Sequence, residues 1–247
     1  NEGILLDYCS VSKVKTAFQI DWVLSKSTGM APKDFVGFSV PYRQDMDRAN
    51  NEKMIAAFSA PFDFLKNNLK GSTYTNEEAT LDKVLAESFD QRIVHFSTHG
   101  WFPEEKGNPF TESCLIFSTQ EGLPDKVASN SENISSSLTP DTIMKNNLDF
   151  SGSHVSMMAC LSGLTREGVA GDALGLDWAI LHAGGASLIS THWEVSADCA
   201  AKFFGFFLPS NYIKFLLIFW TFKFRIIFMD LGNFDNYFFS FYYLFYI

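Results

Sequence analysis

The stretch from Arg92 to Gly100, "RIVHFSTHG", has the length and composition of a buried strand that ends on a histidine and a glycine. Its apolar residues favour a strand, and Gly100 marks the point where the chain leaves it. In parallel α/β sheets, ligands bind in a crevice just beyond the carboxyl ends of the strands. The stretch therefore predicts a strand that carries His99 to such an edge.

Short apolar runs alternate with helix-like stretches on both sides of this strand. We expect further strands at residues 35–40, 154–160 and 186–191, with helices around residues 49–58 and 76–88. This alternation is typical of βαβ units, and most of their strands run parallel. The sequence therefore predicts an α/β fold.

Three of the predicted helices have recognisable ends. Thr75 or Asn76 can cap the helix over residues 76–88, and Thr139 can cap a short helix with Pro140 in its first turn. A third helix is expected to end at Gly184 and Gly185. Its apolar face is predicted to contain Ala170, Leu174, Trp178 and Leu181.

The predicted strand over residues 154–160, "HVSMMAC", ends on a thiol. A cysteine becomes a nucleophile when a nearby imidazole takes its proton, and the imidazole can later return that proton to a leaving amine. The attack creates an oxyanion, which backbone N–H groups stabilise. A glycine lets a substrate approach the main chain without a Cβ in the way. His99, Gly100 and Cys160 thus form a chemically coherent set.

Each of these residues alone has a plainer interpretation, because most lone cysteines and histidines in strands are simply packed. For His95 and Ser97, on the strand face of His99, packing is favoured over catalysis. Neither His154 nor His182 shows a catalytic pattern. The spacing of about sixty residues between His99 and Cys160 favours the reactive pair.

Several separately spaced motifs support that pair, because their order resembles the CHAT domain, a caspase-like peptidase module often found next to TPR repeats. The resemblance covers roughly residues 4–205. Its motifs are "LLDYCSVSKVKTAF", "DFVGFSVP", "NEEATLDKVLAESFDQRIVHFSTHG", "SCLIFS", "LTPDTIM", "VSMMACLSGL" and "GDALGLDWAILHAGGASLISTHWEVS".

The resemblance implies a caspase-like three-layer sandwich, with a mostly parallel central sheet flanked by helices. It also implies a cysteine endopeptidase in which His99 and Cys160 form the dyad. The backbone N–H groups of Gly100 and Cys160 would be the oxyanion donors. Asp172 is implied as a contact for a basic P1 side chain or as a residue that shapes its loop. Trp193 is interpreted either as a wall of the substrate pocket or as a packing residue.

Two functions stay open at this point. The first is the endopeptidase, whose partners would be peptide or protein substrates and the TPR repeats of a longer gene product. The second is a catalytically inactive interaction or signalling module with the same fold, since no third group that orients His99 is evident in the sequence.

The net charge and the cysteine content argue against some classes of function. The net charge of -9 argues against a nucleic-acid surface and suits a cationic peptide partner. Cys9, Cys114, Cys160 and Cys199 show neither CxxC spacing nor a ligand cluster, so we expect no metal, no cofactor and a reducing, cytoplasmic setting. The first residues do not resemble a secretory signal.

The end of the chain differs in composition, because 14 of the 26 phenylalanines follow Lys202. We expect residues 1–205 to form the CHAT-like domain, incomplete at its C-terminal end and for that reason a candidate for lost activity. Residues 206–247 would be a tail outside the family. A membrane-spanning helix needs roughly 18 consecutive apolar residues, and charged residues interrupt every run in this tail before it reaches that length. Two interpretations stay open: a membrane-interface segment, or translated non-coding sequence, which is favoured.

Overall fold

The computed structural model describes residues 33–41, 47–118, 136–167, 173–192, 194, 196–205 and 240–242. The helices are α3 (Arg48–Asn68), η1 (Asn76–Glu78), α4 (Leu81–Ala86), α5 (Pro109–Glu112), α6 (Pro140–Lys145) and α7 (Leu176–His182), and residues 197–205 are also helical. The strands are β1 (Lys33–Ser39), β2 (Gly71–Thr75), β3 (Gln91–Ser97), β4 (His99–Trp101), β5 (Cys114–Ile116), β6 (Ser137–Leu138), β7 (His154–Met158), β8 (Arg166–Glu167), β9 (Ala173–Leu174), β10 (Ser187–Ser190) and β11 (Ser240–Tyr242).

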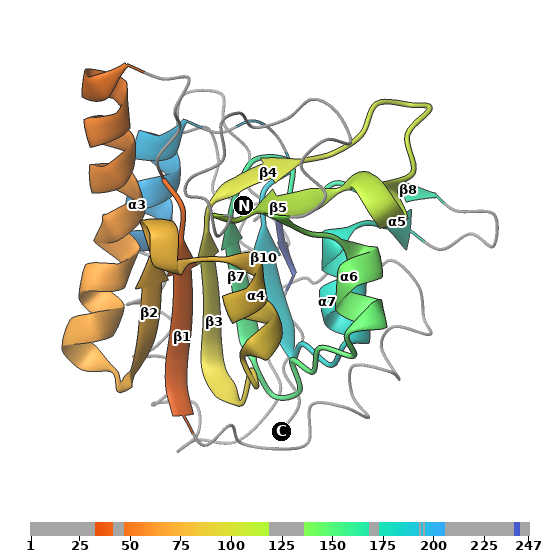
Figure 1. The fold of residues 1–247 in the computed structure, drawn as a ribbon, viewed down its shortest axis with the longest axis horizontal. Coiled ribbons are helices and arrows are strands. Elements are labelled where there is room, and N and C mark those ends of the chain that lie inside the picture. The colour runs from red at the N-terminus through yellow and green to blue at the C-terminus, as the bar shows by residue number, and fades with distance from the viewer. Residues whose placement is uncertain are drawn as a thin grey trace, which may run out of the picture.

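A six-stranded sheet forms the centre of the fold, in the order β11-β10-β7-β3-β1-β2 (Figure 1). Every neighbouring pair from β10 to β2 is parallel, and β11 alone pairs in the antiparallel sense. The predicted α/β class with a mostly parallel sheet is therefore confirmed.

The two faces of the sheet belong to two separate apolar cores, because successive side chains of a strand point to opposite faces. Phe35 packs in one core with Phe58 and Leu65 of α3, and with the helix at residues 197–205. Val36, the next residue, packs in the other core with residues of α4, α6 and α7. Helices thus cover both faces, as Figure 1 also shows, and the predicted three-layer sandwich is confirmed.

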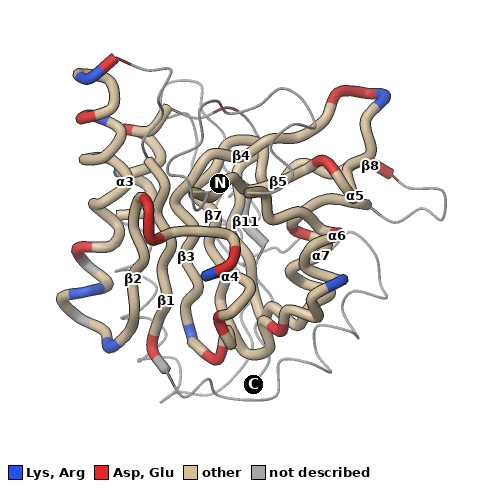
Figure 2. The backbone as a smooth tube through the Cα atoms, in the orientation of Figure 1, with Lys and Arg blue, Asp and Glu red and all other residues tan. Residues whose placement is uncertain are grey.

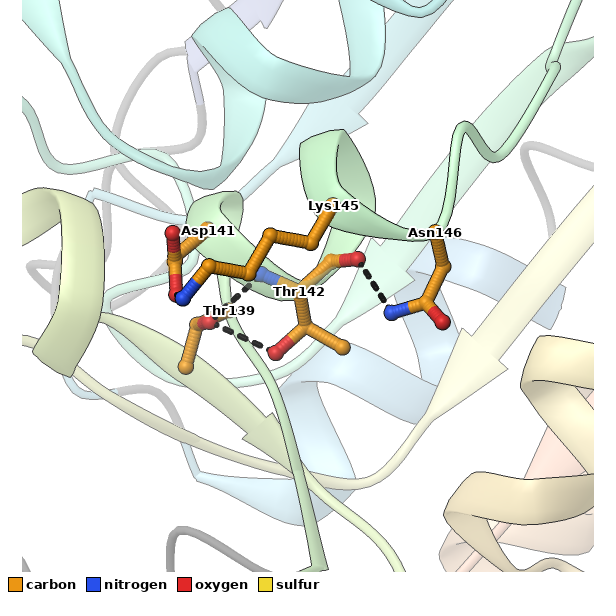
Figure 3. Close-up of polar contacts among 5 residues, drawn as sticks. All are labelled: Thr139, Asp141, Thr142, Lys145 and Asn146. Atoms are coloured by element: carbon orange, nitrogen blue, oxygen red, sulfur yellow. Dashed lines mark hydrogen bonds and ion pairs between the residues drawn. The ribbon is translucent and has the colours of Figure 1, made fainter.

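The start of α6 follows the predicted capping pattern. The backbone N–H of Thr142 donates to the Thr139 hydroxyl over 3.0 Å (Figure 3). Pro140 occupies the first turn. Lys145 pairs with Asp141 over 2.7 Å on the same short helix. Such a cap stabilises this six-residue helix, which also packs Ile143 into the core.

Two of the helix predictions need correction. The segment over residues 76–88 is broken into η1 and α4, and Thr80, not Thr75 or Asn76, caps α4 through a 3.2 Å bond from Lys83 N–H. The helix that ends before Gly184 begins only at Leu176. Leu174 lies in β9, so it does not share the helix face, and Ala170 lies outside the described residues.

Beyond β3 the chain enters a second, smaller sheet. His99 begins β4, which pairs with β5 in the antiparallel sense, and β5 pairs with β6. The predicted strand over residues 154–160 ends at Met158, which leaves Cys160 in the turn that follows. His99 and Cys160 therefore both lie just past the central sheet.

Three residues of the Phe-rich segment, Ser240–Tyr242, form β11 at one edge of the central sheet, where they pair with β10. The other tail residues after position 205 lie outside the described ranges. Of the helices that the structure describes, none is long and apolar enough to cross a membrane.

Candidate active site

The two predicted reactive residues follow neighbouring parallel strands. β3 and β7 pair in a register that places Ser97 beside Met158, and the N–H of Thr98 donates to the Met158 carbonyl over 3.2 Å. His99 and Cys160 each come two residues after this last pair. They therefore leave the sheet at the same edge, where α/β folds bind ligands.

Gly100 packs directly against the main chain of Cys160. A Cβ placed on Gly100 would lie 3.3 Å from the carbonyl carbon of Cys160, and still closer to its carbonyl oxygen. It would also lie 3.2 Å from the Cβ of Ala159. Only a glycine allows the two chain segments to come this close. The structure thus brings the His-Gly segment and the cysteine segment into contact.

Cys160 lies in a tight turn, which we call the cysteine turn (residues 159–163). The N–H of Ser162 donates to the Ala159 carbonyl over 3.3 Å, and Leu161 has a φ of 58°. A positive φ at the third residue is characteristic of a type II turn, in which glycine is usual. A leucine there costs roughly 1–2 kcal/mol, and such strained positions concentrate at functional sites.

The side chain of His99 is only 9% exposed, whereas Cys160 is half-buried. The His99 ring lies 5.8 Å from the ring of Phe58 on α3. The preceding residue, Thr98, donates its hydroxyl to the carbonyl of Ile116 on β5. The histidine therefore belongs to the small sheet, and its ring packs against α3.

The segment after β10 contacts the cysteine turn from the other side. Thr191 donates its hydroxyl to the Ala159 carbonyl, and its N–H donates to the Ser162 hydroxyl over 3.2 Å. Its carbonyl accepts from the N–H of Gly163 over 2.8 Å. The ring of His192 also lies near this turn, since a Cβ on Gly163 would come within 3.0 Å of its Cδ2 atom.

The packing interpretation of His95 and Ser97 agrees with the structure. The His95 ring lies between Phe62 and Phe204, at 5.2 and 5.5 Å, and its Nδ1 is 2.7 Å from the Ser156 hydroxyl. Burial lowers the pKa of His95 to about 3, with a smaller contribution from His154, so the ring is neutral. Ser97 is fully buried beside α3.

Three other residues lie in structural positions: His154, His182 and Cys114. His154 is at the amino end of β7, where its Nδ1 is 2.6 Å from the Ser187 hydroxyl and burial lowers its pKa to about 4. His182 stacks on Trp178 within α7. Burial raises the pKa of the Cys114 thiol to about 11, which keeps it protonated.

Charged residues lie mainly on the helices and loops, and the charges of β1 and β3 lie at the amino ends of these strands (Figure 2). The described carboxyl ends of β3 and β7 carry none. Within the described residues, no three or more His, Cys, Asp or Glu side chains form a cluster able to hold a metal ion.

Arg166 of β8 links the segment after the cysteine turn to the loop after β4. This link lies farther from the ends of β3 and β7. Its guanidinium donates to the carbonyls of Pro103, Glu104 and Gly107 over 2.6 to 2.9 Å, and it lies 5.5 Å from the ring of Phe102. The loop after β4 is therefore held against β8, which follows the cysteine turn.

Two further residues are predicted to contact the substrate. Asp172 and Trp193 lie outside the described residues, so their assignment to a substrate pocket stays a prediction. Sequence reasoning missed Thr191, Ser162 and Arg166. The only available signal for the first two was a hydroxyl residue shortly after each of two apolar strands: Thr191 directly follows β10, and Ser162 comes four residues after β7.

Comparison with known proteins supports the family suggested by the motifs. No curated protein shows significant similarity to the chain. The family model of the CHAT domain matches residues 18–210, which is more than half of the sequence. With its caspase-like arrangement of sheet and helices, the chain belongs to the CHAT domain family.

Proposed function

We propose that this CHAT domain is a cysteine endopeptidase with Cys160 as nucleophile and His99 as general base and acid. The observation that carries the proposal is the contact between Gly100 and the main chain of Cys160, which brings the two strand ends together. Membership of a caspase-like peptidase family supports the same reaction class.

The proposed reaction begins when the His99 imidazole takes the thiol proton of Cys160. The sulfur then attacks the carbonyl carbon of the scissile peptide bond, and the C–N bond breaks as the imidazolium gives its proton to the leaving amine. Water hydrolyses the resulting thioester and restores the thiol. The backbone N–H groups of Gly100 and Cys160 are the proposed oxyanion donors.

The proposed substrates are peptides or proteins with a basic P1 residue. Asp172 would contact that side chain, and Trp193 would form a wall of the pocket, as the family resemblance implies. The net charge of -9 favours such a cationic ligand. We further propose a cytoplasmic setting and an association with TPR repeats in a longer gene product. The proposed reaction needs no metal or cofactor.

Three variants test the dyad: Cys160→Ala, His99→Ala and, as a control, Cys199→Ala on the helix at residues 197–205. Each is assayed against a peptide library that varies P1. Loss of basic-P1 cleavage in the first two but not in the control supports the proposal. Cleavage that survives Cys160→Ala contradicts it.

A second candidate function is a non-catalytic interaction module. The low exposure of His99, at 9%, favours it, because a base must reach its substrate. Thiol alkylation separates the two functions. A catalytic Cys160 reacts with iodoacetamide faster than Cys114 and Cys199 near neutral pH, because its thiolate fraction is raised, whereas a module shows no such preference for Cys160.

A further inference from the structure

We propose that Thr191 and Ser162 are positioning residues that hold Cys160 in its reactive orientation. This inference rests on the proposed function, because it assumes that the orientation of the Cys160 sulfur matters. Neither residue is proposed to touch a substrate. They act only through the backbone of the cysteine turn.

Thr191 contacts the cysteine turn at three points. Its hydroxyl donates to the Ala159 carbonyl before Cys160, and its N–H donates to the Ser162 hydroxyl after it. Its carbonyl accepts from the N–H of Gly163. A single residue thus makes hydrogen bonds to both sides of the cysteine.

Thr191 and Ser162 are both buried, so the loss of their hydrogen bonds is costly. Thr191 is 0% and Ser162 is 1% exposed. Water therefore cannot replace a hydroxyl that a mutation deletes, and a buried polar group left without its partner is costly. Deletion of either hydroxyl is expected to shift the turn.

The turn itself is prone to such a shift. Leu161 has a positive φ, and the hydrogen bond that closes the turn is long, at 3.3 Å between Ser162 N and the Ala159 oxygen. The bond that Thr191 adds to the same oxygen therefore helps to maintain a strained conformation. Strained backbone persists only where its surroundings determine it.

The arrangement fixes the cysteine turn from two sides. Gly100 packs on the Cys160 carbonyl from the β3 side, and Thr191 binds the turn from the β10 side, since β10 is the other neighbour of β7. A Cβ on Gly163 would lie 2.5 Å from the Ser190 hydroxyl oxygen, so this end of the turn also packs closely on β10. Displacements of about 1 Å can cost 10²-fold in rate.

The test compares Thr191→Val, which removes the hydroxyl at nearly constant volume, with Thr191→Ser, which retains it, and with Ser162→Ala. The matched control is Ser153→Ala. Ser153 is a buried serine at the opposite end of the sheet, where its hydroxyl donates to the carbonyls of Phe89 and Gln91. Each variant is measured for kcat, KM, melting temperature, and the rate and pH profile of Cys160 alkylation.

We expect Thr191→Val and Ser162→Ala to lower kcat by about 10- to 100-fold with KM within about twofold. The pH profile of Cys160 alkylation should shift upward, since a displaced thiol loses the influence of His99. Thr191→Ser should recover most of the activity. Ser153→Ala should lower the melting temperature without changing kcat or the alkylation profile.

An unchanged alkylation profile and an unchanged kcat in Thr191→Val overturn the positioning role. A fall in kcat that Ser153→Ala reproduces at equal loss of stability overturns it as well. Failure of the proposed function looks different, because cleavage would then survive Cys160→Ala or be absent from the unmodified protein. In that case the alkylation profile of Thr191→Val still decides the positioning role.

Discussion

Gly100 and Cys160 are in contact through their main chains, although sixty residues separate them in the sequence. The contact exists because β3 and β7 are parallel neighbours and end at the same level. The proposed nucleophile is one of the two contacting residues and the proposed base directly precedes the other, so the contact brings their two chain segments together.

The first prediction concerns Gly100→Ala. Its new Cβ would overlap the Cys160 carbonyl, a backbone atom that cannot move away as a flexible side chain would. We expect the strand ends to separate, with a loss of unfolding free energy of about 1–3 kcal/mol. Peptidase activity should fall about 100-fold or more. Urea unfolding and the peptide cleavage assay measure the two effects.

Gly205→Ala is the matched control, because a Cβ on Gly205 would meet nothing within 4 Å. This variant should keep its activity and its stability. Equal activity in the two glycine variants would mean that the contact between Gly100 and Cys160 has no role in catalysis.

A second prediction separates the two histidines near the cysteine turn. His192 lies beside Gly163, whereas His99 directly precedes the glycine that touches Cys160. We expect His99→Ala to lower kcat about 10³-fold or more, because the thiol loses its base. His192→Ala should lower it less than tenfold. The reverse order of effects, measured with the same peptide, would assign the base to His192.

The strands that hold the candidate site could be predicted from the sequence because their apolar runs are long and strongly patterned. Residues 92–97 lie in β3 and residues 187–190 in β10, as expected. The α4 region was predicted less well. Both Thr75 and Thr80 are possible helix caps, and the sequence does not show which of them is used. It also does not show that the chain makes a separate turn, η1, before α4 begins.

The residues around Cys160 were harder to predict for a different physical reason. The bonds between Thr191 and the cysteine turn join positions about thirty residues apart in the chain, and each of the three involves a backbone atom that every residue has. Sequence patterns report periodicity and residue type, so they indicate Cys160 and His99 as candidates. They carry no information about which hydroxyl reaches which carbonyl.

A third prediction concerns Arg166. Its guanidinium makes hydrogen bonds to three backbone carbonyls of the loop after β4. A hydrogen bond from a charged donor contributes at most about 1.5–3 kcal/mol to stability. We expect Arg166→Ala to raise amide exchange across residues 102–108 and to lower the free energy of unfolding by about 1–3 kcal/mol. Hydrogen exchange with mass spectrometry measures the local effect.

Arg48→Ala is the control for loss of an arginine. Arg48 is 92% exposed and pairs with Glu52 on the surface of α3, where ion pairs contribute little. Its loss should change stability by less than about 0.5 kcal/mol. Unchanged exchange in residues 102–108 of Arg166→Ala would contradict the structural role of that side chain.

The last prediction is that low pH destabilises the folded protein. His95 and His154 of the central sheet are buried and neutral, and their pKa values are lowered to about 3 and about 4. In the unfolded chain both titrate near pH 6.5, so the unfolded state binds more protons below that pH and stability falls as the pH is lowered. From pH 8 to pH 5 the loss is on the order of 2 kcal/mol for each histidine, and it continues until the folded-state pKa is reached. Urea unfolding from pH 5 to 8 should show this slope, and His154→Gln should remove about half of it. A slope that is unchanged in His154→Gln would mean that His154 binds protons equally in the folded and unfolded states, so that burial does not lower its pKa.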